Sequence, residues 1–184
     1  MKSILALDLG TTTGWAARTV LPSGAVIESS GIWTLATDKE LRQQTKFGNP
    51  RALDCRIIAF RDFMEGAVKS IPVDIIVFED VEFSKFRMQT QLWASLRAVV
   101  WLTSGPYFPR GNSGKFEGYI RDVVPVATLK KFATGKGNAK KEDMEKAFKK
   151  RFPGRKFATD DEIDAVFVLE WTKQKYDVKH RRKR

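Results

Sequence analysis

Cysteine and histidine are almost absent from this chain of 184 residues, which has one of each. The lone cysteine, Cys55, cannot form an internal disulfide, which fits a reducing compartment. Cys55 lies in an apolar helical pattern, so we interpret it as a small core residue. The only histidine, His180, lies in a basic segment near the C-terminus. This scarcity argues against a zinc site and against a Ser-His-Asp or Cys-His nucleophile.

Long hydrophobic runs are also missing. No segment approaches the roughly 18 consecutive apolar residues that a membrane-spanning helix needs. The first residues, Met1 and Lys2, lead directly into a short strand pattern instead of a secretory leader. We therefore predict a cytoplasmic protein without a membrane partner.

Negative charge is in deficit, because 33 Lys and Arg residues outnumber 22 Asp and Glu residues. The resulting net charge of +11 favours a polyanionic partner, either nucleic acid or an anionic surface. The length suits one compact domain. We predict a single domain over residues 1–177 and a disordered basic tail over residues 178–184, because the end of the chain lacks apolar residues.

Apolar periodicity predicts an α/β fold with a mixed sheet. The first three strands would form an antiparallel meander, and later strands would join in parallel through crossover helices. The predicted strands are residues 3–8, 15–20, 25–35, 73–79 and 123–127. The predicted helices are residues 50–71, 88–103, 128–134, 139–151 and 160–176, with a loop or short helix at 36–49 and an exposed loop at 104–119.

Two predicted strands, Ile4–Asp8 and Ile75–Glu79, end directly in a carboxylate. Burying a carboxylate is costly unless it is paired or bound to a metal. Neighbouring parallel strands would bring both carboxylates to one edge of the sheet, where α/β proteins commonly carry their sites. A turn beside Gly10 would explain Asp8 alone, but Glu79 has no such ordinary explanation.

A third acidic cluster begins the last predicted helix. Asp161 and Asp164 are three positions apart, so they share one helical face. The helix dipole favours acids in a first turn, which would place Asp161 and Glu162 there even without a site. Four carboxylates in one pocket would repel each other unless divalent cations neutralised them. Two Mg²⁺ ions would do so and could support phosphodiester cleavage. The candidate catalytic and metal-binding residues are Asp8, Glu79, Asp161 and Asp164.

Four segments of the chain, taken in order, resemble the motifs of RuvC-type Holliday junction resolvases. Three of them, Leu5–Ala16, Ile76–Val81 and Asp161–Val166, carry the acids. The fourth, Thr128–Lys141, resembles that family's basic helix–glycine–helix segment. The match covers most of the chain, and the combination is more specific than any single segment.

The resemblance implies an RNase H-like fold and a Mg²⁺- or Mn²⁺-dependent endonuclease. It also implies a homodimer that resolves four-way DNA junctions by paired nicks. Lys130 and Lys141 would lie near the scissile phosphate, and Lys136 and Lys140 would also bind DNA.

The chain departs from the family pattern at one position. Where family members often carry an aromatic residue three positions after the second acid, this chain has Glu82. Phe83 or Phe86 would then take over the stacking role at the junction. A glycine-rich insertion at 105–118 and the basic tail are typical of a divergent member, bacterial or phage-encoded.

Other functions remain open. The same fold could cut flaps, replication forks or RNA, or it could bind branched DNA without cutting it. The segment Asp8–Gly14 also resembles a phosphate loop of sugar kinases and actin-like ATPases. Those proteins need two such domains, and this chain shows no second copy of the motif.

Overall fold

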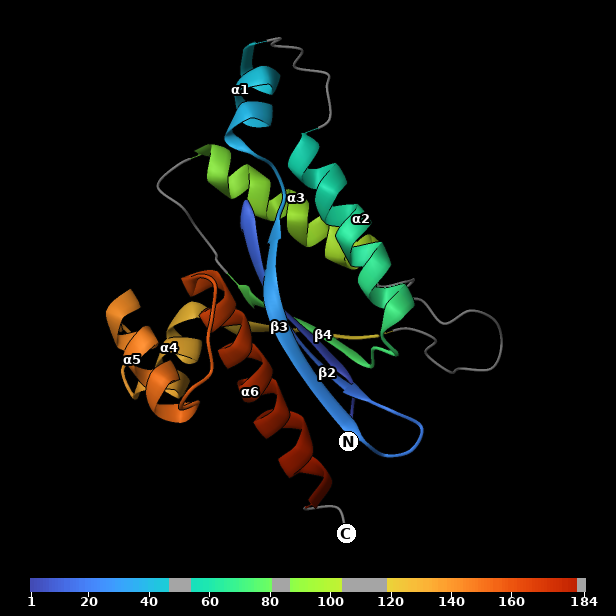
Figure 1. The fold of residues 1–184 in the computed structure, drawn as a ribbon, viewed down its shortest axis with the longest axis vertical. Helices are drawn as coiled ribbons and strands as arrows, with labels where there is room; N and C mark the ends of the chain where they lie inside the picture. The colour runs from blue at the N-terminus through green and yellow to red at the C-terminus, as the bar shows by residue number, and fades with distance from the viewer. Residues whose placement is uncertain (47–53, 81–86, 104–118, 182–184) are drawn as a thin grey trace.

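The computed structural model describes residues 1–46, 54–80, 87–103 and 119–181, which form a five-stranded sheet with helices on both faces (Figure 1). The strand order is β3-β2-β1-β4-β5. The pairs β1–β2 and β2–β3 are antiparallel, whereas β1–β4 and β4–β5 are parallel, so the predicted mixed sheet is confirmed. The strands are β1 (Ile4–Asp8), β2 (Thr12–Val20), β3 (Val26–Thr34), β4 (Ile75–Asp80) and β5 (Ile120–Pro125).

Helices α2 and α3 cover one face of the sheet, and α4, α5 and α6 lie on the other (Figure 1). Of the helices in the described ranges, none combines the length and apolar character needed to cross a membrane. The helices are α1 (Asp38–Lys46), α2 (Cys55–Ser70), α3 (Arg87–Thr103), α4 (Val126–Thr134), α5 (Lys141–Arg151) and α6 (Asp160–Arg181).

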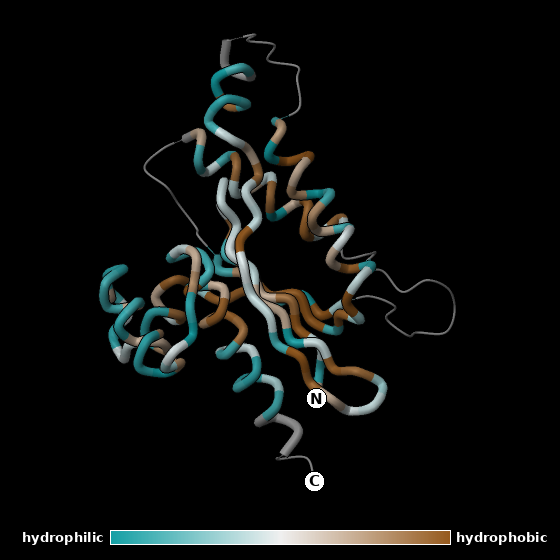
Figure 2. Tube along the Cα trace, viewed as in Figure 1, coloured by the Kyte–Doolittle hydropathy of each residue, from teal (hydrophilic) through white to brown (hydrophobic). Residues whose placement is uncertain are grey.

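The central strands are buried on both faces, which explains their unbroken apolar sequences. Side chains alternate along a strand, so Ile75 and Val77 of β4 pack toward α6, while Ile76 and Phe78 pack toward α2 and α3. Figure 2 shows hydrophobic residues concentrated in the central strands and hydrophilic residues along α5. Each face of the sheet therefore has its own hydrophobic core.

Several element boundaries differ from the predicted ones. Helix α2 begins at Cys55, where Asp54 caps it by accepting a 2.9 Å hydrogen bond from the Arg56 N–H, and Pro50 lies outside the described residues. Strand β2 begins at Thr12, inside the predicted turn, because Thr12 pairs with Thr34 of β3.

The C-terminal half shows two further differences. Ala127 belongs to helix α4 rather than to the preceding strand, which already ends at Pro125. Helix α6 continues past its predicted end near Tyr176 to Arg181, so residues 178–181 of the predicted tail are helical. Residues 182–184 and the insertion at 105–118 lie outside the described ranges.

Helix α6 is held against the sheet near both of its ends. Near its start, the buried Glu162 accepts hydrogen bonds from the Ser30 hydroxyl at 2.5 Å and from the Ala158 N–H at 2.7 Å. Near its other end, Asp177 binds the guanidinium of Arg18, which is only 2% exposed, at 2.6 and 3.1 Å. A buried charge without its partner is costly, so these contacts fix where α6 lies along β2 and β3.

The beginning of α6 approaches β2 so closely that Gly14 has no room for a side chain. A Cβ atom at Gly14 would lie 1.9 Å from the carbonyl oxygen of Asp161. Gly14 is also the residue that pairs with Asp8 across β1 and β2. This glycine therefore lets the acidic end of α6 reach the strand ending that carries Asp8.

We predict that Gly14→Ala destabilises the protein by about 3 kcal/mol, because the helix must move away from the sheet. Urea denaturation followed by circular dichroism would measure the change. Gly66→Ala is the matched control, since nothing lies within 4 Å of a Cβ there and Gly66 is an exposed residue of α2. The control should gain about 0.5–1 kcal/mol from better helix propensity. Equal stabilities of the two variants would contradict the proposed close contact.

Candidate active site

Three carboxylates meet at the edge of the sheet where β1 and β4 end. Ligand oxygens of Asp8, Glu79 and Asp164 all lie within 4.8 Å of one another. The register explains this, because Leu7 pairs with Phe78 and the next residue in each parallel strand is the acid. Asp164 comes from the first turns of α6, which packs on β1 and β2. The predicted meeting of both strand endings with the helix is thus observed for these three residues.

Asp161, the fourth predicted acid, lines the same pocket, which has a volume of about 660 Å³. Its carboxylate is not part of the tight group of three found among the described residues. It accepts a 3.3 Å hydrogen bond from the Thr159 hydroxyl. Burial and the charge of Asp160 raise the pKa of Asp161, whereas the bond from Thr159 lowers it. Asp161 is therefore a neighbour of the acid cluster rather than a member of it.

The three clustered acids hold their protons more tightly than ordinary carboxyl groups do. Burial, followed by the charges of Glu79 and Asp164, raises the pKa of Asp8 well above its usual value. Burial and then Glu79 raise the pKa of Asp164 to about 7, against an opposing effect of Lys130. Burial also raises the pKa of Glu79, while Lys130 and a hydrogen bond with Asp8 act in the other direction. The positive charge of Lys130 therefore does not offset the effect of burial on the pKa values of Glu79 and Asp164.

A divalent cation fits this cluster. Oδ1 of Asp164 is buried without a hydrogen-bond partner, although buried polar atoms are normally satisfied. The clustered donors are all carboxylate oxygens, the ligands that Mg²⁺ and Mn²⁺ prefer. A hard cation bound among Asp8, Glu79 and Asp164 would satisfy the free oxygen and, above the raised pKa values, neutralise the charge that protons no longer neutralise.

Two predicted lysines lie at this pocket. Lys130 of α4 lines it and lowers the pKa values of Glu79 and Asp164. Lys141, the first residue of α5, also lines it and forms an ion pair with Asp160. Because 81% of the Lys141 side chain is exposed, this pair stands at the pocket mouth. Asp160, which the sequence did not single out as a site residue, therefore engages a lysine of α5.

The other predicted DNA-binding residues lie elsewhere. Lys136 lines a separate groove between α4 and α5 and is not among the residues lining the acid pocket. Lys140 is exposed at the N-cap of α5, where its N–H donates to Asp143 at 3.2 Å. Phe83 and Phe86 lie outside the described residues, so their predicted stacking role stays a prediction.

Helix α3 contributes two pocket residues that the sequence did not reveal. Gln89 and Trp93 line the acid pocket one helical turn apart. The helix buries Leu92 and Leu96 in the core, which leaves Gln89 and Trp93 at the edge of that apolar face. Their spacing in the sequence is only that of an amphipathic helix, so no local signal marks them.

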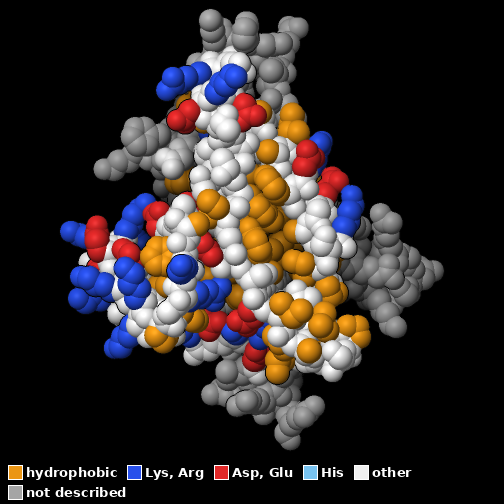
Figure 3. All heavy atoms as spheres, viewed as in Figure 1, with side chains coloured by type: hydrophobic (Ala, Val, Ile, Leu, Met, Phe, Trp, Pro, Cys, Tyr) orange, Lys and Arg blue, Asp and Glu red, His pale blue; other side chains and the backbone are white. Residues whose placement is uncertain are grey.

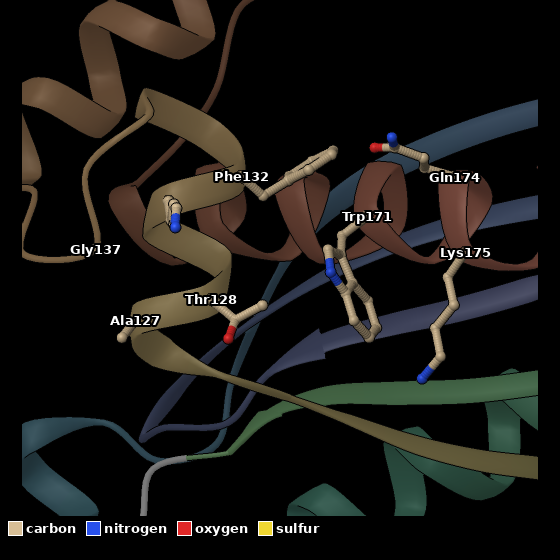
Figure 4. A pocket seen from close by; sticks show the side chains of 8 residues that line it. Ala127, Thr128, Phe132, Gly137, Trp171, Gln174 and Lys175 are labelled. Atoms are coloured by element: carbon tan, nitrogen blue, oxygen red, sulfur yellow. The ribbon is translucent and has the colours of Figure 1, made fainter.

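A second hollow, of about 710 Å³, lies between α4 and α6 (Figure 4). Phe132 and Trp171 line it together with Lys175. The Lys175 ammonium already binds Asp122 at 2.6 Å and lies 4.7 Å from the centre of the Trp171 ring. None of the four predicted acids lines this hollow, so it is not a second copy of the acid pocket.

We predict that the metal-free protein loses stability as pH rises from about 4 to about 7. Asp164 has an ordinary pKa of 3.8 when unfolded and about 7 when folded, so the folded state binds more protons in that range. The loss at pH 8 should be on the order of a few kcal/mol. Thermal unfolding in EDTA across this pH range would measure it, and Asp164→Asn should flatten the dependence.

Adding Mg²⁺ should raise the melting temperature at pH 8 in the wild type and much less in Asp164→Asn. Asp62→Asn is the matched control, because it removes one charge from an exposed side chain that pairs with Arg61 on α2. The control should behave as the wild type. If Mg²⁺ does not change the melting temperature of the wild type at pH 8, the metal site is wrong.

Comparisons with known proteins give a match in structure only. No protein-family model and no curated protein matches the sequence. The structure is similar to that of T. thermophilus RuvC in complex with Holliday junction substrate, with a TM-score of 0.61 and 11% identity. That match covers 91% of this chain and 90% of the RuvC chain.

Two further solved structures share the fold. A second Thermus thermophilus RuvC structure gives a TM-score of 0.56 and 11% identity, with 90% of each chain covered. The yeast mitochondrial Holliday junction resolvase Ydc2 gives a TM-score of 0.57 and 13% identity. That match covers 98% of this chain and 81% of the Ydc2 chain. These matches confirm the predicted resemblance at the level of the fold: the chain has the RNase H-like fold of RuvC.

Proposed function

We propose that the protein is a Mg²⁺- or Mn²⁺-dependent endonuclease that resolves four-way DNA junctions. The observation that carries the proposal is the cluster of Asp8, Glu79 and Asp164, whose ligand oxygens lie within 4.8 Å of one another. The fold shared with RuvC supports the choice of junction DNA, since one of the matched structures contains a Holliday junction. The net charge of +11 suits a polyanionic substrate.

Each residue at the pocket has a distinct task in this proposal. Asp8, Glu79 and Asp164 would hold the metal, and Asp161 could add a ligand for a second ion. Bound divalent ions activate a water molecule and stabilise the leaving oxygen of a phosphodiester. Lys130 would offset the negative charge of the scissile phosphate, because its ammonium already acts on two of the acids.

The Lys141–Asp160 pair would respond to the substrate. An exposed ion pair contributes little to stability, so it can be exchanged at low cost. A phosphate arriving at the pocket mouth would compete with Asp160 for the Lys141 ammonium. Lys141 would then bind the substrate backbone next to the metal site.

Paired nicks require two copies of the chain. The described part of one chain contains one cluster of three acids, enough for one cut. Opposing strands of a junction would therefore be cut by two chains, which supports a homodimer. Flaps, forks and RNA are the alternative substrates for the same chemistry, since the acids act on the phosphodiester and do not read the shape of the nucleic acid.

We predict that Asp8→Asn lowers the rate of junction cleavage by more than about 100-fold, since even changes to groups that support a metal ligand reach that range. Junction binding in EDTA should persist, because the variant keeps the basic surface. Gel assays with four-way junctions, forks, flaps, linear duplex and RNA would measure cleavage, and fluorescence anisotropy would measure binding.

Asp62→Asn is again the charge-matched control and should cut as the wild type does. If the wild type cuts flaps or RNA but never four-way junctions, the nuclease chemistry stands and the junction specificity is wrong. If it cuts none of these substrates with Mg²⁺ or Mn²⁺, the proposed function is wrong.

A further inference from the structure

A groove rich in positive charge runs between α4 and α5. It has a volume of about 570 Å³ and shares no lining residue with the acid pocket. Figure 3 shows Lys and Arg side chains gathered over this end of the molecule. The polar side chains that line the groove are Thr134, Lys136, Asp143, Lys146, Lys150 and Arg151.

Three cations of this groove have no acidic partner. Within the described ranges, no carboxylate forms an ion pair with Lys136, Lys146 or Lys150, and all three are exposed. Lys149, by contrast, binds Glu145 at 2.7 Å from another side of the same helix. The one carboxylate in the groove, Asp143, accepts the Lys140 N–H at 3.2 Å and so serves the start of α5.

The backbone beneath these cations is fixed. The Thr134 hydroxyl donates to the Lys130 carbonyl at 2.8 Å and accepts the Lys136 N–H at 3.1 Å. Gly135 ends α4 with φ of 85°, a conformation that suits glycine. Lys136 is thus held at the α4–α5 turn, facing the same groove as Lys146 and Lys150.

The helix dipole accounts for only part of this charge. Lys150 and Arg151 lie in the last turn of α5, where cations are favoured in any helix. Lys136 follows the C-cap of α4, where the dipole of that helix also favours a cation, but Lys146 lies in the middle of α5, so no dipole explains it. Unpaired cations from the α4–α5 turn and from α5 that converge on one groove are what binding of a polyanion requires.

We infer that the α4–α5 groove binds backbone phosphates of a DNA duplex arm, at a site separate from the acid pocket. The inference rests on the proposed nucleic-acid substrate. The contacts would be to phosphates, so they would hold and orient an arm without reading its sequence. Lys136, Lys146 and Lys150 would carry the binding.

Helix α5 links the groove to the acid pocket. Lys141 at its first turn lines the pocket, and Lys150 near its end lines the groove. Nine residues of helix span about 13.5 Å, which corresponds to about four base pairs at 3.4 Å each. A DNA backbone at the acid pocket would therefore meet the groove a few nucleotides away.

The test is the salt dependence of DNA binding, measured by fluorescence anisotropy in EDTA with the full chain carrying Asp8→Asn. Against that background, Lys146→Ala/Lys150→Ala should weaken binding to junctions and to linear duplex by about 10-fold or more at 0.1 M KCl. The slope of log K against log[KCl] should become about 1.8 less steep, because two phosphate contacts are lost. Lys146→Arg/Lys150→Arg should restore the slope.

The control, Lys69→Ala/Lys149→Ala, removes the same net charge from lysines that pair with Glu65 and Glu145. Its slope should match that of the parent. Equal slopes for the two double alanine variants would contradict DNA binding in the α4–α5 groove, even if the wild type cuts junctions. A reduced slope in Lys146→Ala/Lys150→Ala alone would support DNA binding in the groove. That result would hold even if the wild type cuts nothing and the proposed nuclease function is wrong.

Discussion

The close contact between helix α6 and strand β2 at Gly14 sets the geometry on which the candidate site depends. Because Gly14 pairs with Asp8 and lies under the Asp161 carbonyl, one residue joins the strand ending to the helix that supplies Asp164. The hydrogen bonds to Glu162 and the Arg18–Asp177 ion pair then fix the rest of the helix. Backbone packing therefore brings the three residues that carry the clustered acids to one edge of the sheet.

That position has an electrostatic consequence. Burial raises the pKa values of Asp8, Glu79 and Asp164, and neighbouring carboxylates raise those of Asp8 and Asp164 further. Oδ1 of Asp164 is also buried without a hydrogen-bond partner, so the cluster carries an electrostatic penalty. Nearby cations relieve it only in part, because Lys130 opposes the shift and Lys141 is engaged by Asp160. We therefore expect a bound cation to stabilise the site, as metal binding does when it is coupled to folding.

The sequence predicted the sheet and the meeting of the acids because both follow from local patterns. An apolar run that ends in an acid marks a buried strand and its functional end, as Asp8 and Glu79 do. Properties that depend on tertiary packing were not predictable. Examples are the placement of Lys136 in a separate groove, the role of Gln89 and Trp93 at the pocket, and the engagement of Asp160 by Lys141. Each depends on which helix faces which, and a single segment does not carry that information.

The three clustered acids come from the beginning, the middle and the end of the chain. Asp8 and Glu79 are in place once β1 and β4 pair, but Asp164 arrives only with α6. A chain emerging from the ribosome therefore carries an incomplete cluster until α6 has been translated. Under the proposed function, this order of elements would delay metal-dependent cutting until α6 has docked on the sheet.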